Sequence, residues 1–459
     1  MYFEMIYDES LAQASYFIGC QAAKVAAVID PKRDIDTYIQ IAEKRNMKIT
    51  QIYETHIHAD FLCGSRELAE VTGAEMFLSD EGDDVWRYDF QHTPLKHGTV
   101  TKLGNLKIET IHTPGHTPEH LSFLLTDTPA SQEPVMLFTG DFVFVGDVGR
   151  PDLLEEAAGI ADTKEKGALQ MFDSLTNFNS LGDYIQLWPG HGAGSACGKA
   201  LGAVPVSTIG YEKIRNWALN LLNDKNAFVE ELLSGQPEPP KYFAMMKKLN
   251  KEQRPLLTSV PKWKKLDEND WQNAIKNQIK VIDTRNAKEF AEKYATNSIN
   301  IVNNNSFSTW MGWFMDYNED FIVVVNDENE VDNLTRKLMR IGLDNCKGYI
   351  TFSELGKFKL ELSSFETLNK AQLKAEIETG KRQLIDVRGT TEFESGTIGN
   401  AKHLFVGKLP QNLTSLNKDE AYIIFCQSGV RATIAHSYLK KHEFDVKIYT
   451  GGYSEWSQA

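Results

Sequence analysis

The sequence has no concentration of positive charge and no long apolar run. Its 459 residues carry a formal net charge of −14, and the densest basic stretch is KWKK at 262–265. A protein that holds a phosphate backbone or an anionic membrane needs clustered Lys and Arg, so we expect neither nucleic acid nor a membrane as a partner. Apolar runs such as FIVVV at 321–325 are too short to span a bilayer.

Cysteine is also scarce. Five cysteines in 459 residues do not make a disulfide framework. The N-terminal stretch MYFEMIYDESLAQAS is acidic and lacks the charged-then-apolar layout of a signal peptide. Together these features predict a cytoplasmic protein in a reducing environment.

The length of the chain predicts roughly three domains. To about residue 250, β-type runs alternate with helical patterns. We expect Asp30 to be a helix N-cap, with Pro31 at the first helical position. The Pro-rich stretch GQPEPPKY at 235–242 precedes the end of this pattern and predicts a first domain of residues 1–256. Strands are expected at KITQIYET (48–55), LKIETI (106–111), HLSFLLT (120–126), VMLFTG (135–140) and DYIQLW (183–188).

The remaining chain contains an internal repeat. VIDTRNAKEF begins at residue 281 and LIDVRGTTEF at 384, and further on FIVVVNDENEVDNLTRKLMRIGLD parallels YIIFCQSGVRATIAHSYLKKHEFD. Each copy reads as strand, loop, helix and strand, which is typical of a small α/β domain. The repeat predicts two α/β domains, at residues 257–361 and 362–459.

Six candidate metal ligands stand at the ends of predicted strands, where side chains share one rim. Two histidines and one carboxylate on one face leave three positions open, as in non-haem Fe(II) oxygenases, whereas zinc binds such donors tetrahedrally and keeps a position for water. Three of the six can form such a triad, with the other three orienting it. Spacing does not choose between the metals. The triad is His56, His116 and Asp141, and the others are His58, Asp60 and His191.

The order of these motifs resembles the metallo-β-lactamase fold, an αββα sandwich, and especially its glyoxalase II-like branch, over roughly residues 1–250. In two-metal members of that fold, the residue after the counterpart of Asp60 is a histidine that helps to hold the second ion. Here that residue is Phe61. The resemblance therefore disfavours a two-metal hydrolase, although Asp60 and His191 remain as ligands for a weakly occupied second site, and His58, Asp60 and His191 are either orienting groups or additional metal ligands.

Four motifs, THIHAD, HTPGHTPEH, FTGDFVFVGDVGRPDL and WPGHGAGSACGKALG, resemble the persulfide dioxygenases, the iron-dependent relatives of glyoxalase II. The resemblance implies one Fe(II) per chain on His56, His116 and Asp141, with zinc as the alternative metal. It also implies that O2 oxidises the terminal sulfur of a thiol persulfide. Arg150, in DVGRPDL, either anchors the anionic substrate or forms a structural ion pair.

The segment IIFCQSGVRATIAHSYLKKH places Cys426 between a β-run and a helix. Backbone N–H groups of the loop, the N-terminus of the helix and the charge of Arg431 would all lower the pKa of the thiol and stabilise a persulfide anion. The Cys-x-x-Gly-x-Arg pattern resembles the rhodanese sulfurtransferases, over about residues 362–459. Ala432 departs from that pattern, because a Ser or Thr is common there.

The other copy of the repeat has lost the thiol. Asn326 occupies the cysteine position and Val331 the arginine position, and NDENE makes the loop acidic. We therefore expect residues 257–361 to be catalytically silent. Among the other cysteines, Cys197 near the metal motifs is the best candidate for a second persulfide-reactive thiol, and Cys20 is a weaker one.

As a whole the chain resembles the three-domain persulfide dioxygenase–sulfurtransferase fusions of Gram-positive bacteria. The fold class is α/β and α+β multidomain, with an αββα domain followed by two rhodanese-like domains. The resemblance implies a sulfide-detoxifying enzyme that converts low-molecular-weight thiol persulfides and O2 to sulfite and then thiosulfate. Two alternatives remain, a zinc-dependent thioester hydrolase of the glyoxalase II type and a non-catalytic persulfide sensor or carrier. We also expect a homo-oligomer.

Overall fold

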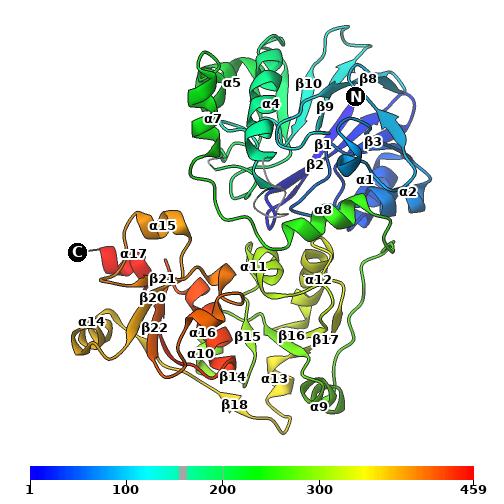
Figure 1. Ribbon diagram of the computed structural model, residues 1–459. Coiled ribbons are helices and arrows are strands. Elements are labelled where there is room, and N and C mark those ends of the chain that lie inside the picture. The colour runs from blue at the N-terminus through cyan, green and yellow to red at the C-terminus, as the bar shows by residue number, and fades with distance from the viewer. Residues whose placement is uncertain (154, 156–162, 200, 459) are drawn as a thin grey trace. The chain divides into compact units, whose positions relative to one another are not determined.

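The computed structural model describes residues 1–153, 155, 163–199 and 201–458. The chain divides into two compact units (Figure 1). The first unit is Met1–Val260 with Met339–Gly342, and the second is Pro261–Leu338 with Leu343–Ala459. Within the described ranges, no helix is both long enough and apolar enough to cross a membrane.

Two six-stranded sheets form the centre of the first unit. Their strand orders are β1-β2-β3-β4-β5-β6 and β12-β11-β10-β9-β8-β7. The first sheet consists of β1 (Tyr2–Asp8), β2 (Gln13–Cys20), β3 (Val25–Ile29), β4 (Lys48–Tyr53), β5 (Glu75–Ser79) and β6 (Thr93–Leu95). The second consists of β7 (Val100–Leu103), β8 (Leu106–His112), β9 (Leu121–Asp127), β10 (Met136–Gly140), β11 (Gln186–Pro189) and β12 (Ser207–Thr208).

Helices cover the outer faces of both sheets (Figure 1). On the first sheet lie α1 (Asp36–Arg45) and α2 (Ser65–Thr72). The second sheet is covered by α4 (Thr163–Phe178), α5 (Ile209–Arg215), α6 (Trp217–Asn220) and α7 (Lys225–Leu233). A short 3₁₀ turn, η1 (Asp84–Trp86), and α8 (Phe243–Lys251) complete the unit.

Three apolar layers hold this unit together. Alternate residues of the two sheets face each other in the central layer, which includes Tyr16, Tyr53, Phe123 and Phe138. The outer layers join the first sheet to α1 and α2, and the second sheet to α4 and α7. Burial on both faces explains why these strands are almost continuously apolar. The layers confirm the predicted αββα sandwich.

All five strands named from the sequence are present, as β4, β8, β9, β10 and β11. The predicted helix start was wrong. Helix α1 begins at Asp36, with Ile35 as its N-cap, and Asp30 lies in the left-handed region with φ +49°. Its carboxylate accepts hydrogen bonds from Thr55 instead of capping a helix. A tertiary contact has therefore overridden a local capping signal.

The second unit contains both copies of the repeat. The first copy has a four-stranded sheet of order β15-β13-β16-β17, and the second has a five-stranded sheet of order β19-β23-β22-β20-β21. All paired strands within these two sheets are parallel. Strands β14 and β18 form a separate antiparallel pair.

The elements of the first copy are α9 (Glu268–Lys276), β13 (Lys280–Asp283), α10 (Ala287–Glu292), β14 (Tyr294–Ala295), β15 (Ile299–Asn300), α11 (Phe307–Phe314), β16 (Phe321–Val325), η2 (Glu328–Glu330), α12 (Val331–Met339), β17 (Cys346–Thr351) and α13 (Phe352–Leu355). Then follow β18 (Leu362–Ser363), β19 (Thr367–Leu368), α14 (Lys370–Thr379), β20 (Gln383–Asp386), α15 (Thr390–Glu394), β21 (Lys402–His403), η3 (Val406–Lys408), η4 (Leu413–Ser415), β22 (Ala421–Phe425), α16 (Val430–Lys441), β23 (Asp445–Tyr449) and α17 (Gly452–Ser457).

The two copies repeat the same buried ion pair. Arg285 donates to Asp283 at the end of β13, with Nε–Oδ1 3.0 Å and Nη2–Oδ2 2.7 Å. Arg388 donates to Asp386 at the end of β20 with the same two distances. The repeat seen in the sequence is therefore a repeat of the fold.

The first copy packs directly against α16, the helix that follows the Cys426 loop. The backbone N–H of Asn300 donates to Ser437 Oγ at 3.0 Å, and the ring centroids of Phe314 and Tyr438 lie 5.3 Å apart. Most of α16 is buried, from Ala432 to Ser437. Although it has Asn326 where the second copy has Cys426, this copy covers a face of the helix that follows the Cys426 loop.

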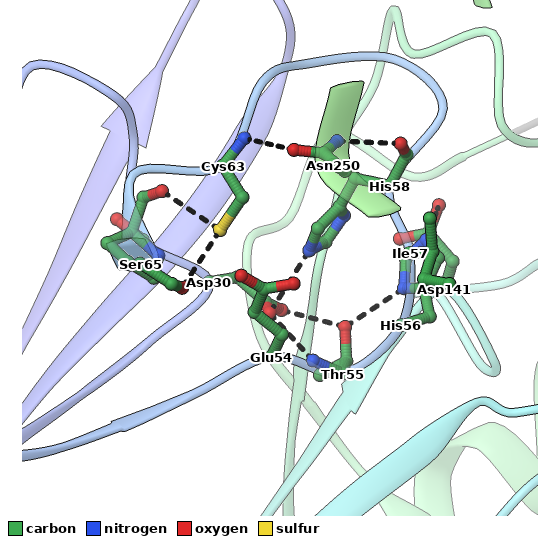
Figure 2. A network of polar contacts seen from close by, with 12 residues as sticks. Asp30, Glu54, Thr55, His56, Ile57, His58, Cys63, Ser65, Asp141 and Asn250 are labelled. Carbon is green, nitrogen blue, oxygen red and sulfur yellow. Dashed lines mark hydrogen bonds and ion pairs between the residues drawn. The ribbon is translucent and has the colours of Figure 1, made fainter. Parts of the chain in front are cut away.

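Helix α8 fixes the loop that carries the first metal motif (Figure 2). Its buried Asn250 donates to the carbonyl of His58 at 2.8 Å and to that of Phe61 at 2.7 Å. Its Oδ1 accepts from the backbone N–H of Cys63 at 2.8 Å. One amide side chain thus satisfies three backbone groups across the loop.

Replacing Asn250 with Ala should lower the free energy of unfolding by about 3 kcal/mol, because buried backbone groups lose their partners. Chemical denaturation of the full chain measures the change. The matched control is Asn226→Ala, at an exposed position on α7, for which we expect a change within about 0.5 kcal/mol. Equal stability of Asn250→Ala and the unmodified chain would contradict this role.

Candidate functional site

Three of the predicted ligands meet at one point in the first unit. His56 follows β4, His116 lies between β8 and β9, and Asp141 follows β10. Their ligand atoms all lie within 4.8 Å of one another. Asp141 Oδ2 is 3.5 Å from His116 Nε2 and 4.0 Å from His56 Nε2. The sandwich fold therefore brings residues from three separate strand ends together in one cluster.

The cluster has the chemistry of a cation site. His56 Nε2 and both oxygens of Asp141 are buried and have no hydrogen-bond partner among the described residues. Buried polar atoms are rarely left unpaired without a reason. Two imidazole nitrogens and a carboxylate are donors that both Fe(II) and Zn(II) accept. The residues present thus fit one divalent metal ion.

The second nitrogen of each histidine is already engaged. His56 Nδ1 lies 3.0 Å from Thr55 Oγ1, and His116 Nδ1 lies 2.8 Å from the carbonyl oxygen of Arg150. Because Arg150 O can only accept, His116 carries its proton on Nδ1 and leaves Nε2 free. Such outer contacts orient metal-binding histidines and set their tautomer.

Asp30 is a residue of this site that the sequence reading assigned to a helix cap (Figure 2). Its two oxygens accept from Thr55 N and Thr55 Oγ1, each at 2.8 Å, and Oδ1 lies 3.1 Å from His58 Nε2. Asp30 therefore connects to His56 through the Thr55 hydroxyl. Its position directly after β3, like that of the ligands after their strands, was the signal that could have revealed it.

His58 faces Asp30 rather than the triad. Burial alone would lower its pKa, but the nearby Asp30 carboxylate outweighs burial and raises the pKa of His58 to about 9. The other side of its ring packs on Phe61, with centroids 4.4 Å apart. His58 is not part of the first cluster, which consists of His56, His116 and Asp141; their role as metal ligands stays a prediction.

His120 is a second residue that the sequence reading did not single out, although it belongs to the quoted HTPGHTPEH motif. Its Nε2 accepts from the backbone N–H of Asp141 at 3.0 Å, and its Nδ1 lies 2.8 Å from Thr113 Oγ1. Its ring stacks on His56 with centroids 5.0 Å apart. His120 thus contacts two members of the triad, the backbone of Asp141 and the ring of His56.

The remaining two predicted ligands form a second cluster together with a cysteine. Ligand atoms of Asp60, His191 and Cys197 also lie within 4.8 Å of one another. His191 Nε2 is 3.2 Å from Asp60 Oδ2 and 3.5 Å from Asp141 Oδ2. Burial, followed by the charges of Asp60 and Asp141, raises the pKa of the Cys197 thiol to about 12.

Cys20 lies elsewhere in the first unit. It ends β2 and belongs to the apolar layer between the sheets, where its Sγ accepts from the backbone N–H of Asn105 at 3.3 Å. Its reactivity toward persulfides stays a prediction, as does that of Cys197.

Arg150 is buried and makes the structural ion pair that was one of its two interpretations. Its guanidinium donates to both oxygens of Asp152, at 2.7 and 2.6 Å, and to the carbonyl of Pro237 at 2.7 Å. A direct contact with substrate stays a prediction. Its carbonyl oxygen accepts the hydrogen bond from His116 Nδ1 and so orients that histidine.

A small cavity of about 70 Å³ has His116, one of the three clustered residues, in its wall. Trp86, Lys166 and Gln170 are also part of the lining. The ammonium of Lys247 lies 3.6 Å from the centroid of the Trp86 ring. The wall of the cavity therefore includes an aromatic ring and the lysine Lys166, and a second lysine, Lys247, packs on that ring.

The second predicted site surrounds Cys426, which directly follows β22. Its side chain is fully buried, and Sγ accepts the backbone N–H of Gly429 at 3.1 Å. Gly429 has φ +96°, and a Cβ there would lie 2.8 Å from Thr450 O, so the turn requires glycine. The thiol thus stands at the N-terminus of α16, as predicted.

Arg431 lies on the first turn of α16 and pairs with Glu392 on α15, with Nη2–Oε1 2.7 Å. Burial disfavours its charge, but Glu392 and Cys426 outweigh burial and raise the pKa of Arg431. Glu392 was not identified from the sequence. In the first copy, Asn326 stands after β16 as Cys426 stands after β22, and its amide donates to Glu289 at 3.2 Å.

Comparison with known proteins assigns families to both units. The metallo-β-lactamase superfamily model matches residues 10–191, and the rhodanese-like domain model matches residues 262–351 and 369–459. A crystal structure of a metallo-β-lactamase from Staphylococcus aureus is 40% identical with a TM-score of 0.69, and it covers 76% of this chain and 98% of its own.

Two curated relatives match the first unit. A probable polyketide biosynthesis zinc-dependent hydrolase of Bacillus velezensis is 25% identical over 223 residues, which is 48% of this chain and 91% of the relative. A hydroxyacylglutathione hydrolase of Rhodospirillum rubrum is 30% identical over 176 residues, which is 38% of this chain and 60% of the relative. From these matches and its fold, the chain belongs to the metallo-β-lactamase superfamily, as a fusion of a metallo-β-lactamase domain with two rhodanese-like domains.

Proposed function

We propose that the chain is an iron-dependent persulfide dioxygenase joined to a thiosulfate-forming sulfurtransferase. The observation that carries the proposal is the His56, His116 and Asp141 cluster, which offers three donors to one ion, while Phe61 packs on His58 instead of supplying a further ligand. The loop of Cys426 in the same chain supports a substrate that carries sulfane sulfur. A simple thioester hydrolase would have no use for that loop.

The first reaction balances as RSSH + O2 + H2O giving RSH and sulfurous acid, which ionises to sulfite. The sulfane sulfur loses four electrons, and O2 gains them. Bound Fe(II) would supply adjacent open positions for both substrates and a path for the electrons. His56, His116 and Asp141 would hold it, and Thr55 and the Arg150 carbonyl keep the two histidines oriented.

The small cavity at His116 supports separate binding places for the two ends of the substrate, the persulfide sulfur and its carrier. A volume of about 70 Å³ accommodates a sulfur-bearing end and excludes a large carrier. The exposed Lys166 and the Trp86–Lys247 pair would attract the anionic persulfide and its carrier outside the cavity. The carrier thiol is held mainly outside the cavity, by Lys166 and the Trp86–Lys247 pair.

The second reaction uses Cys426. Its thiolate attacks the sulfane sulfur of another RSSH, the S–S bond breaks, and RSH leaves with the proton. The sulfur of sulfite then attacks the terminal sulfur of the Cys426 persulfide, releasing thiosulfate and the thiolate. The Gly429 N–H, the N-terminus of α16 and Arg431 stabilise the anionic sulfur at each stage.

A zinc-dependent thioester hydrolase is the second candidate function. The curated relatives of the first unit include a zinc-dependent hydrolase and a hydroxyacylglutathione hydrolase. Such an enzyme would use the same cluster to activate water. Consumption of O2 separates the two functions.

With a low-molecular-weight thiol persulfide, the iron-loaded full chain should consume O2, and His116→Ala should lower the rate at least about 100-fold, because a direct metal donor matters at least as much as the outer partners that contribute 10–100-fold. An oxygen electrode measures the rate. His97→Ala is the matched control, since His97 is exposed in the same unit. Hydrolysis of an acyl-thiol without O2 uptake would replace the proposal by the hydrolase.

Replacing Cys426 with Ser should leave O2 uptake unchanged while sulfite accumulates in place of thiosulfate, because only the transfer step uses this thiol. Ion chromatography of the products distinguishes the two anions. Cys346→Ser, in the silent copy, is expected to alter neither product nor rate. Loss of O2 uptake in Cys426→Ser would contradict the separation of the two reactions.

A further inference from the structure

A cavity of about 870 Å³ lies in the second rhodanese-like copy. Its wall is formed by residues 364–368, by α14 and the turn after it, by the first residue of β22, and by α16 and β23. None of the loop residues 426–431 is part of that wall, so the cavity is separate from the sulfurtransferase site. Sites for small molecules commonly have volumes of about 300–1,000 Å³. The cavity is therefore large enough to hold a small organic molecule.

His436, on α16, is a buried polar residue in the wall of this cavity. It is 1% exposed, and its Nδ1 has no hydrogen-bond partner among the described residues. Its ring packs against Phe365, with ring centroids 4.0 Å apart. Burial and the ammonium of Lys440 lower the pKa of His436 to about 3, although the backbone of Val446 opposes this shift, so the ring is neutral. A buried polar atom without a partner calls for an explanation, and a ligand in the cavity provides one.

Positive charge predominates in the wall, in a chain whose net charge is −14. Arg382 and Lys447 each pair with an acidic neighbour. Lys381 and Lys440 are exposed, and in the described part of the chain neither ammonium has an ion pair. Two cations are therefore available to a ligand. The basic residues of the wall are Lys381, Arg382, Lys440 and Lys447, and the acidic ones are Glu366 and Glu376.

We propose that this cavity binds a small organic anion that has an apolar or aromatic part. The acidic group of the ligand pairs with Lys381 and Lys440. Its apolar part lies against Phe365 and Leu368, which also belong to the wall, and a polar group of the ligand bonds to His436 Nδ1. Such a combination of apolar surface with a few convergent polar groups is typical of small-molecule sites.

Titration of the full chain with 8-anilinonaphthalene-1-sulfonate tests the site. This probe joins a sulfonate to aromatic rings, and its fluorescence reports binding to apolar protein surface. We expect one saturable site per chain. Lys440→Glu should weaken binding about 10-fold, because a repulsion replaces an attraction. The matched control is Lys402→Glu, at an exposed position of the same copy outside the wall, which should leave the affinity unchanged.

A second variant tests the place of binding without changing charge. Ala375 is an exposed residue of α14 in the wall, and Ala375→Trp should lower the affinity at least about 10-fold, because the indole occupies the space of the ligand. Ala371→Trp, exposed on the same helix and outside the wall, is the control. Cys426→Ser should bind the probe as the unmodified chain does.

Two results would overturn the proposal. The first is equal affinity of Ala375→Trp, Lys440→Glu and the unmodified chain, which would place the probe outside this cavity. The second is loss of binding in Cys426→Ser, which would place the probe at the sulfurtransferase loop. Weaker binding in Ala375→Trp and Lys440→Glu alone supports the site, whether or not the chain consumes O2.

Discussion

The buried carboxylate of Asp141 is the feature on which the first unit's chemistry depends. Its Oδ2 lies within 4.0 Å of ring nitrogens from His56, His116 and His191, in a region that water does not reach. A charge in such a place is costly unless it is paired or binds a cation. The backbone N–H of Asp141 donates to His120 Nε2, and the Thr55 hydroxyl donates to Asp30 and lies 3.0 Å from His56 Nδ1. These contacts keep the groups in place.

The sequence predicted the parts of the fold and site that follow from local pattern. His56, His116 and Asp141 each follow the end of a strand, namely β4, β8 and β10. Because such strand ends meet at one edge of the sandwich, the triad could be proposed from spacing and resemblance together. The position of Cys426 was predictable from local pattern too, because a cysteine in the loop between a strand and a helix lies near the N-terminus of that helix. The repeat of Asp283 and Asp386 likewise carried over from sequence to fold.

The remainder depends on contacts between distant segments. Asp30 has the local signature of a helix cap, but its carboxylate is used by Thr55, so a tertiary contact decided its role. Asn250 is an ordinary helical asparagine in sequence, and only the fold brings it to the loop of His58 and Phe61. The meeting of Cys197 with Asp60 depends in the same way on how an irregular loop returns to the metal edge.

Loss of the thiol in one rhodanese-like copy has not removed its structural contribution. Asn326 has replaced the nucleophile, yet this copy keeps the Arg285–Asp283 pair and covers α16 through Asn300 and Phe314. The helix so supported begins at the Cys426 loop and provides the positive end that the thiolate needs. Under the proposed function the two copies would have separate tasks, the second reacting through Cys426 and the first supporting the helix behind it.

The central claim is that O2 oxidises the sulfane sulfur of a persulfide at the triad. The most direct test is the ratio of O2 consumed to sulfite formed by the iron-loaded full chain carrying Cys426→Ser, in which sulfite is not passed on. We expect one sulfite for each O2 consumed. Persulfide or thioester turnover with no O2 consumed would contradict it.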